Sequence, residues 1–462
     1  MTGHITAQLA EFSAAVSLDR IDPAIADRAK LLLLDTIGIA VRARHDAEST
    51  PAMLHAAGRL GFMSGTAAIF GDSATASFAG AAWINGALAH SLDFDDTHAA
   101  GSIHPSAPIV PAALAAAQMA GASGKDVLAG IIAGYEVQIR LSLALVPKDH
   151  YARGFHPTAT CGAFGAAAAA GRVLGLNAAQ IAHGFGVCLS QTSGTMEFLA
   201  DGAWTKRFQA GYAAMNGLIA ASLAAEGFIG PAKPIEGEHG FLNSYAPHPV
   251  FENATAGLGE RYETLAIAVK PYPSCRYSHA AMDALIALRA QHGFAIAHIE
   301  AVEIGLPKTG WDIIGNPQAA KQNPKSIVDG QFSMPFLAAV ALREGGMGWD
   351  DYARHLHDPE TLALTRRITS IIDPQAEAED PRQMSGVARV RTRNGSFEKF
   401  AAIPKGEPEN FPGLPELRRK FDALAGPYMT QPALDRLADA LMTLDRANTV
   451  DAMLALTRPQ IN

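Results

Sequence analysis

Cysteine is scarce in this chain of 462 residues, which contains Cys161, Cys188 and Cys275 and no others. Three widely separated cysteines form neither a disulfide framework nor a C-x-x-C metal pair, and this usage is typical of a reducing compartment. The amino-terminal stretch MTGHITAQLAEF also lacks a basic region followed by an apolar core, so it does not resemble a signal peptide. We therefore expect a cytoplasmic protein.

Charge and aromatic residues are also sparse, at 18% and 7% of the chain, and the formal net charge is -8. This balance excludes a broad basic field, so no nucleic-acid partner is expected. The small-apolar runs at 107–121 and 158–171 are dominated by Ala and Gly rather than Leu and Ile, so no membrane association is expected either. Abundant Ala and Gly favour closely packed helices.

Cofactor motifs are missing as well: there is no G-x-S-x-G, no Walker loop and no strand-borne G-x-G-x-x-G. We therefore expect no nucleotide, flavin or other cofactor. The D-x-D-D-x-H pattern does supply oxygen and nitrogen ligands, but its spacing matches no metal motif. No metal site is assigned, and a metal enzyme built on Asp93, Asp96 and His104 is kept as an alternative.

Helical periodicity dominates both ends of the chain, beginning with a strong helix start at Asp22-Pro23. Near Leu265 the pattern changes, and LAIAVK, AHIEAVEIGLP and GVARVRTRNGSF read as strands, the last with an Asn-Gly hairpin turn. From PKGEPENFP onward the pattern is helical again. The sequence thus predicts a mainly α protein: an all-helical domain of residues 1–266 and 405–462, with an inserted α+β domain of residues 267–404.

The chain is organised around AHSLDFDDTHAAGSIHP, residues 89–105, at the end of a helix predicted over 78–92. Six titratable side chains crowd this short span, although its flanks are small and apolar. They are His90, Asp93, Asp95, Asp96, His98 and His104. A solvated acidic loop would contain more Ser, Lys and Glu and would lack Leu92 and Phe94, so we interpret the stretch as the wall of a cleft.

Three further stretches carry candidate functional residues. Tyr151 and His156 lie in a loop that leads into a helix predicted from Pro157, and the amino terminus of a helix favours anions such as carboxylates. Lys206 precedes another helix, and Lys270 ends a strand close to Arg276, which would lower its pKa and suit it to act as a base. This set of His, Tyr, Lys, Arg and Asp residues suits proton transfer next to a carboxylate.

These motifs resemble those of the MmgE/PrpD family, which includes 2-methylcitrate dehydratase, cis-aconitate decarboxylase and iminodisuccinate epimerase. The resemblance covers nearly the whole chain and rests on five stretches, WINGALAHSLDFDDTH with HPSAPIVPA, HYARGFHPTAT, GTMEFLADGAWTKRFQAGYAA, KPYPSCRYSH and SIVDGQFSMPF. It implies a large all-helical domain, an α+β lid domain, a homodimer, and an active site in the cleft between domains that needs no cofactor.

The resemblance also assigns site residues. The matching motif positions are Asp93, Thr97, His104, His156, Lys206 and Lys270. Tyr151 and Lys270 match the pair that acts in the epimerase as two bases on opposite faces of the substrate. This chain departs from the residue pattern of the decarboxylase at two positions. Cys275 occupies the position of a histidine in that enzyme, and Trp311 lies in the region where its tyrosine is expected.

We therefore predict a lyase or isomerase that abstracts a proton α to a carboxylate of a small di- or tricarboxylate. The predicted catalytic residues are Lys270, Tyr151, His104 and His156, and the predicted substrate-binding residues are Asp93, Thr97, Lys206 and Arg276. A hydro-lyase resembling 2-methylcitrate dehydratase ranks first, an epimerase second and a cis-aconitate-type decarboxylase third. The alternative from another class is a catalytically silent helical scaffold that only binds or dimerises.

Overall fold

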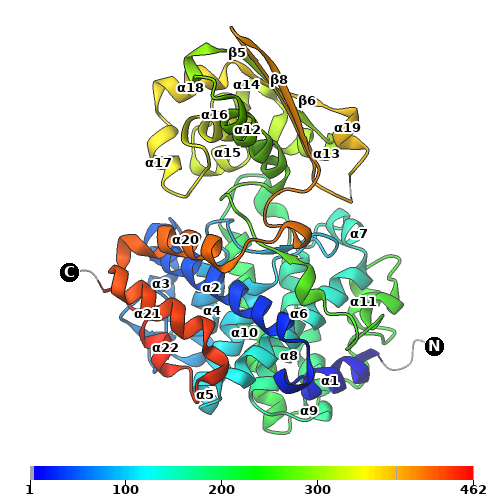
Figure 1. Ribbon diagram of the computed structural model, residues 1–462. Helices are drawn as coiled ribbons and strands as arrows, with labels where there is room; N and C mark the ends of the chain where they lie inside the picture. Colours follow the sequence, from blue (N-terminus) through cyan, green and yellow to red (C-terminus); the bar gives the residue numbers. More distant parts are fainter. Residues whose placement is uncertain (1–4, 381, 461–462) are drawn as a thin grey trace. The chain divides into compact units, whose positions relative to one another are not determined.

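Helices make up most of the computed structural model, which describes residues 5–380 and 382–460 (Figure 1). The chain divides into two units, one formed by the residues up to Val269 together with those from Gly413 on, and the other by Lys270–Pro412. The predicted mainly helical fold is confirmed.

The first unit is almost wholly α-helical. Its helices are α1 (Ile5–Ala15), α2 (Pro23–Asp46), α3 (Thr50–Arg59), α4 (Phe78–Ala89), α5 (Ser106–Ala120), α6 (Gly124–Leu145), α7 (Pro147–Ala152), α8 (Pro157–Val173), α9 (Ala178–Leu189), α10 (Thr205–Ala225), α11 (Phe241–Tyr245), α20 (Leu414–Ala425), α21 (Gln431–Met442) and α22 (Asp451–Ala455). Its short 3-10 turns are η1 (Leu18–Arg20), η2 (Glu197–Leu199), η3 (Phe251–Ala254), η4 (Glu263–Ala266), η9 (Gly426–Tyr428) and η10 (Leu444–Arg446). Its strands are the antiparallel pairs β1 (Ala67–Ala68) with β2 (Thr75–Ala76) and β3 (Thr97–His98) with β4 (Ile267–Ala268).

Local sequence explains where these helices begin. Asp22 caps α2 by accepting a hydrogen bond from the Ala24 amide, and Pro23 occupies the first helical position, as predicted. The carboxyl-terminal helices α20 and α21 pack on α2, so the last part of the chain lies beside the first (Figure 1). The helical unit is therefore closed by segments from both ends of the chain.

Small residues let the helices of this unit approach closely. Helix α4 crosses α10 where Gly86 meets Gly211: a Cβ built on Gly86 would lie 2.8 Å from the Gly211 Cα. A Cβ on Gly211 would in turn lie inside contact distance of the Trp83 carbonyl oxygen. This crossing brings the end of α4 near the start of α10, because Gly86 lies one turn before His90 and Gly211 shortly after Lys206.

Helix α6 runs through the core of the first unit. Among the described residues it is the one helix long and apolar enough to cross a membrane by length and composition, and 94% of its most apolar window is buried inside the protein. It also contains a buried ion pair, with Arg140 Nε 3.2 Å from the Glu136 carboxylate. Glu136 in addition accepts hydrogen bonds from the amides of Glu263 and Thr264, so α6 anchors the chain that leads out of this unit.

The second unit combines a four-stranded sheet with short helices. Its strands are β5 (Ile299–Leu306), β6 (Ile368–Ile372), β7 (Gly386–Thr392) and β8 (Gly395–Ala401). Its helices are α12 (His279–His292), α13 (Lys308–Gly310), α14 (Gln318–Lys321), α15 (Ile327–Gln331), α16 (Met334–Glu344), α17 (Asp351–His355), α18 (Pro359–Thr365) and α19 (Pro374–Glu377), with the 3-10 turns η5 (Arg276–Ser278), η6 (Ile296–His298) and η8 (Pro408–Asn410) and the π-turn η7 (Trp311–Gly315). The strand order is β6-β5-β7-β8, with β5 and β6 parallel and the other pairs antiparallel.

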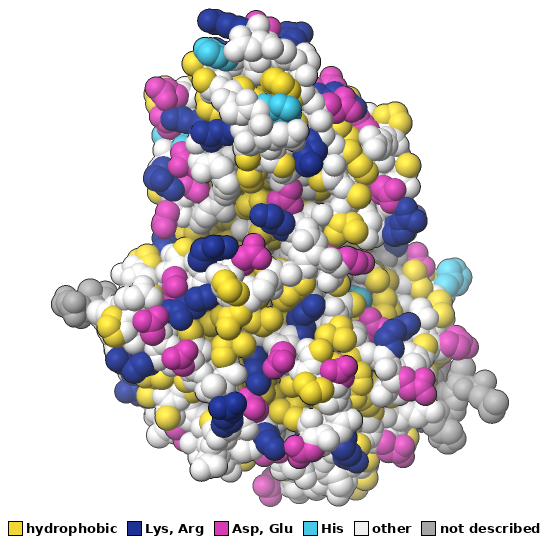
Figure 2. Space-filling view, viewed as in Figure 1, with side chains coloured by type: hydrophobic (Ala, Val, Ile, Leu, Met, Phe, Trp, Pro, Cys, Tyr) yellow, Lys and Arg dark blue, Asp and Glu magenta, His cyan; other side chains and the backbone are white. Residues whose placement is uncertain are grey.

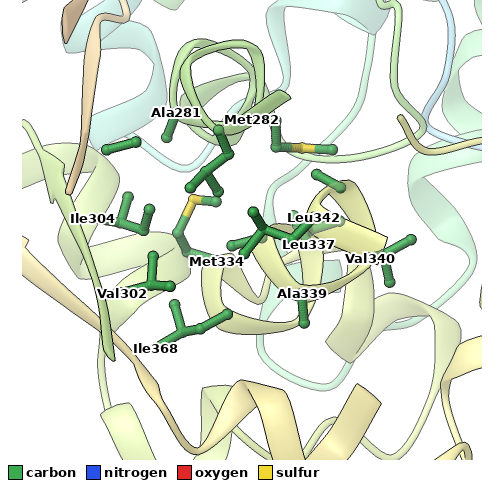
Figure 3. Packing of buried hydrophobic residues seen from close by; sticks show 14 of the residues in the cluster. Ala281, Met282, Val302, Ile304, Met334, Leu337, Ala339, Val340, Leu342 and Ile368 are labelled. Carbon is green, nitrogen blue, oxygen red and sulfur yellow. The ribbon is translucent and has the colours of Figure 1, made fainter. Parts of the chain in front are cut away.

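The core of the second unit is built from larger side chains than the helical unit uses. Met282 from α12 and Met334 and Leu337 from α16 pack against Val302 and Ile304 of the sheet (Figure 3). The predicted Asn-Gly hairpin joins β7 to β8. The run LAIAVK forms only the two-residue strand β4, which pairs with β3 in the first unit, because Pro271 and Pro273 directly beyond it cannot donate to a ladder.

On the face drawn in Figure 2, basic and acidic side chains are interspersed in each unit, and no large area carries one sign of charge.

Candidate functional site

The span of titratable residues identified in the sequence forms a loop between α4 and α5. His90 ends α4, and the loop contains two non-glycine residues with left-handed backbone, Asp93 (φ 52°) and Ser102 (φ 50°). This region is uncommon for residues other than glycine and is tolerated when the surroundings over-determine it. The strand pair β3–β4 and the start of α5 hold the loop at its middle and its end.

Asp95 lies at the centre of the loop between two imidazoles. Its Oδ2 is 2.6 Å from Nδ1 of His90 and 3.2 Å from Nδ1 of His104. The side chains of Asp95 and His90 are fully buried, whereas that of His104 is 14% exposed. The rings of His90 and His104 meet edge to face with centroids 4.6 Å apart, so His104 is the member of this group that a ligand can reach.

The other two aspartates of the DFDD run have different partners. Asp93 forms an ion pair with Lys206 at the start of α10, with Oδ1 2.6 Å from Nζ. Asp96 accepts hydrogen bonds from the amide and the hydroxyl of Ser106, the first residue of α5, and the Ser106 Oγ lies 2.5 Å from the Tyr135 hydroxyl. Asp93 therefore ties the loop to α10, and Asp96 ties it to α5.

A lysine from the carboxyl-terminal segment supports the loop. Lys420 of α20 places its Nζ 2.7 Å from Oδ1 of the buried Asp35 and donates a 3.0 Å hydrogen bond to the Phe94 carbonyl. The same ammonium lies 3.8 Å from the centroid of the Phe94 ring, a cation–π distance. Residues far apart in the sequence thus hold the backbone between Asp93 and Asp95.

His156 joins the same group from the start of α8. Its ring stacks on His90 with centroids 5.9 Å apart, and its Nδ1 lies 2.9 Å from the Gln209 Oε1. Gln209 in turn donates through Nε2 to the Thr195 carbonyl at 2.9 Å. Gln209 and Phe198, which both contact His156, also line an open hollow of about 470 Å³.

Tyr151 and Thr97 complete the predicted residues of the first unit. The Tyr151 hydroxyl donates a 2.8 Å hydrogen bond to the Ser102 carbonyl, so it lies against the loop. Thr97 is buried, and its hydroxyl has no hydrogen-bond partner among the described residues; the same is true of Nε2 of His90. Buried polar atoms without partners are rare and concentrate at functional sites.

Burial and nearby charges set the pKa values of this group. Burial lowers the pKa of His104 to about 4 and also lowers the pKa values of His90 and His156. The charge of Asp95 opposes this lowering at His104 and His90, whereas the charge of Lys206 adds to it at all three rings. Burial also lowers the pKa of Lys206, but Asp93 and Asp95 outweigh it and the pKa is raised. The site thus holds neutral imidazoles beside a charged lysine.

The carboxyl and phenol groups complete this pattern. Burial raises the pKa of Asp95, yet the two neighbouring imidazoles outweigh it and hold the pKa well below the usual range. Burial raises the pKa of Asp96 to about 8 and raises that of Tyr151, so the tyrosine keeps its proton at neutral pH.

Lys270 and Arg276, the remaining predicted residues, belong to the second unit. The Lys270 side chain is buried at the start of that unit. Arg276 forms an ion pair with Glu407, and both side chains are largely buried. A substrate carboxylate would therefore compete with Glu407 for this guanidinium.

The sequence analysis counted His90 and Asp95 among the crowded titratable groups but assigned neither a role, and it did not identify Gln209 or Lys420. Asp95, rather than Asp93 or Asp96, is the aspartate beside the His104 ring. No periodicity marks His90 and Asp95 as a pair, since they join a helix end to a loop. The crowding of titratable groups in residues 89–105 was the available signal.

His90, Asp95 and His104 are residue types that can bind a metal ion. Ligand atoms of His90, Asp95 and His104 lie within 4.8 Å of one another. The 2.6 Å contact of His90 with Asp95 is a hydrogen-bond distance. Asp93 pairs with Lys206 and Asp96 with Ser106, so the predicted alternative set of Asp93, Asp96 and His104 does not form one cluster of ligand atoms among the described residues.

Two family models match most of the chain. The family model of the MmgE/PrpD N-terminal domain matches residues 7–254, and that of the MmgE/PrpD C-terminal domain matches residues 272–445. The cis-aconitate decarboxylase-like protein oryM of Aspergillus oryzae is 27% identical over 98% of this chain and 97% of its own length, and the cis-aconitate decarboxylase of Aspergillus terreus is 25% identical over 98% and 95%. The human cis-aconitate decarboxylase is 29% identical over 58% of this chain and 56% of its own length. The chain belongs to the MmgE/PrpD family.

Proposed function

We propose that the protein is a lyase that acts on a small di- or tricarboxylate by moving a proton at a carbon next to a carboxylate. The observation that carries this proposal is the buried group of neutral histidines, His90, His104 and His156, beside the charged Lys206. A neutral imidazole is the form that accepts a proton, and a nearby cation stabilises the negative charge that develops on the substrate. Membership of the MmgE/PrpD family supports a lyase, without indicating which lyase reaction.

The residues divide into two roles in this proposal. His104, His156 and Tyr151, with Lys270, exchange protons with the substrate. Lys206, Asp93, Thr97 and Arg276 bind or orient its carboxylates and hydroxyl. The amino terminus of α8, directly after His156, adds a favourable dipole for an anion. No cofactor is part of the proposed reaction.

The favoured reaction is loss of water, as in 2-methylcitrate dehydratase. Removal of water needs one base and one acid, and the protonated Tyr151 beside neutral imidazoles supplies both.

Decarboxylation is the second candidate, because two relatives matched over 98% of this chain are named cis-aconitate decarboxylase and cis-aconitate decarboxylase-like protein. Cys275 and Trp311, at positions where the decarboxylase pattern has other residues, weigh against it.

A panel of hydroxylated and unsaturated di- and tricarboxylates tests the proposal in deuterated buffer. New absorbance of a conjugated alkene would establish dehydration, and released carbon dioxide would establish decarboxylation. Deuterium exchange without a change of composition would establish an epimerase. If no compound gives any of these signals, the chain is the silent scaffold of the alternative hypothesis.

We also propose that the protein is a homodimer, as the family resemblance implies. Helix α10 leaves Trp204, Phe208 and Leu223 partly exposed, with Trp204 directly before it, and such side chains favour burial against a partner. Sedimentation equilibrium tests this point, and a monomer at micromolar concentration would contradict it.

A further inference from the structure

Asp95 differs from its neighbours in what it contacts. Asp93 pairs with a lysine and Asp96 caps a helix, whereas the hydrogen-bond and ion-pair partners of Asp95 among the described residues are the imidazoles of His90 and His104. Its second oxygen, Oδ1, is buried without a hydrogen-bond partner. A purely structural aspartate in a loop normally accepts from backbone amides, so this one serves the imidazoles.

The ionised carboxylate decides which ring nitrogens carry protons. A bare Nδ1 facing the same buried oxygen would bring two lone pairs together, so both histidines present Nδ1–H to Asp95. The proton-free nitrogen of each ring is then Nε2. His90 Nδ1 forms a 2.6 Å hydrogen bond with Asp95, whereas His104 Nδ1, at 3.2 Å, is close to the same oxygen without the geometry of a hydrogen bond. Catalytic hydrogen bonds are often this loose before a ligand binds.

His90 and His104 differ in how far their side chains are exposed to solvent. His90 is fully buried, and its Nε2 has no partner among the described residues, whereas His104 is partly exposed. Both rings share one carboxylate oxygen, but only His104 can present its Nε2 to a ligand. His90 therefore serves as a matched control for His104 within the same network.

We propose that Asp95 is a positioning residue that holds His104 with its proton on Nδ1, so that Nε2 is the nitrogen that exchanges a proton with the substrate. This inference rests on the proposed lyase function. His104 then accepts a proton before it can donate one. The carboxylate of Asp95 stabilises the imidazolium that forms, a role a buried acid plays beside a catalytic histidine in other enzymes.

In the favoured dehydration, the substrate C–H bond breaks and its proton forms a bond to Nε2 of His104. The electron pair of that bond becomes the new C=C bond as the C–O bond to the departing hydroxyl breaks. The hydroxyl leaves as water with the proton of Tyr151, and His104 and Tyr151 then recover their starting states by proton exchange with solvent.

Nitrogen-15 NMR of histidine-labelled wild-type protein at pH 7 tests the tautomer without any substrate, with His104→Gln used to assign the resonance. The expected result is a protonated Nδ1 and a bare Nε2 on His104. A protonated Nε2 in the wild type would overturn the proposal even if the enzyme were active. The expected tautomer in a protein that turns over no polycarboxylate would leave Asp95 supported as the positioning residue and would count against the lyase function alone.

Kinetics of Asp95→Asn test the consequence. Because an amide can turn its NH2 toward Nδ1 and reverse the tautomer, kcat is expected to fall on the order of 100- to 10,000-fold. KM should stay within about threefold, since the loss falls on the transition state. His90→Gln should lower kcat by no more than about tenfold, because that ring does not reach the substrate. An unchanged kcat in Asp95→Asn, or equal losses of kcat in the two variants, would contradict the proposal.

Discussion

The sheet of the second unit and the loop of residues 90–106 in the first unit hold their charged side chains in different ways. In the second unit, ion pairs such as Arg391 with Glu300 lie on the solvent-facing side of the sheet, 64% and 47% exposed. In the first unit, charges around the loop of residues 90–106 are buried and shared: Asp95 lies between two imidazoles, and Lys420 lies between Asp35 and Phe94. Buried ion pairs contribute little net stability, although removing one partner of such a pair is costly.

The largest difference between the units should appear when a buried cation is removed. Lys420→Met leaves the Asp35 carboxylate buried without its ammonium, and such a loss costs about 3–5 kcal/mol. Arg391→Gln removes an exposed cation and should cost no more than about 1 kcal/mol. Urea denaturation measures the loss of unfolding free energy in each variant. Equal losses would show that removing the buried Lys420 costs no more than removing an exposed cation.

A second contrast is the closeness of packing. Gly211→Ala forces a methyl group against the backbone of Trp83 at the crossing of α4 and α10, and overpacking of this kind costs about 1–3 kcal/mol. The control is Gly346→Ala in the second unit, where an added Cβ meets nothing within 4 Å and the change should be within about 0.5 kcal/mol. Lower activity of Gly211→Ala below its melting temperature would show that the crossing also aligns His90 with Lys206.

Acid should destabilise the histidine-rich first unit before the second. The pKa of His104 is lowered from 6.5 to about 4, and that of His150 is lowered to about 4 as well, both by burial. Between these two values the unfolded chain binds protons that the folded chain does not, so stability falls as pH falls from about 6.5 to about 4. Melting curves that resolve the two units measure this slope; a first unit with flat stability over that range would contradict neutral buried histidines.

The opposite dependence of stability on pH is expected from Asp96. Its pKa is raised by burial to about 8, so the folded state binds its proton more tightly than the unfolded state between about 4 and 8, and this contribution is lost as pH rises. Asp96→Asn cannot ionise. We expect the stability of this variant relative to the wild type to improve steadily from pH 4 to pH 8 in denaturant titrations. A difference independent of pH would place the pKa of Asp96 near its ordinary value.

Much of the fold follows from local sequence. The helix start at Asp22-Pro23, the helices that became α4, α8 and α10, and the Asn-Gly hairpin between β7 and β8 were all predicted from capping, periodicity and turn chemistry. The strand predicted in LAIAVK was largely wrong, because prolines end it after two paired residues. Local patterns succeed where the residues concerned are neighbours in the chain.

The site was predictable only in part for the same reason. Motif matches identified His104, His156, Lys206 and Asp93, and the structure brings these together in the first unit. The contact between Lys420 and the Phe94 carbonyl joins residues hundreds of positions apart, and no spacing rule links them. Asp95 was visible as a charge, but its partners depend on how α4 ends and α5 begins.

The most direct test of the account compares wild type with His104→Asn on a polycarboxylate that the wild type converts, with solvent deuterium incorporation and product formation followed together. We predict that the variant keeps its fold, as judged by circular dichroism, and loses kcat on the order of 100- to 10,000-fold, the range expected when a proton-transfer group is removed. Undiminished turnover and exchange in His104→Asn would contradict the assignment of the chemistry to the loop between α4 and α5.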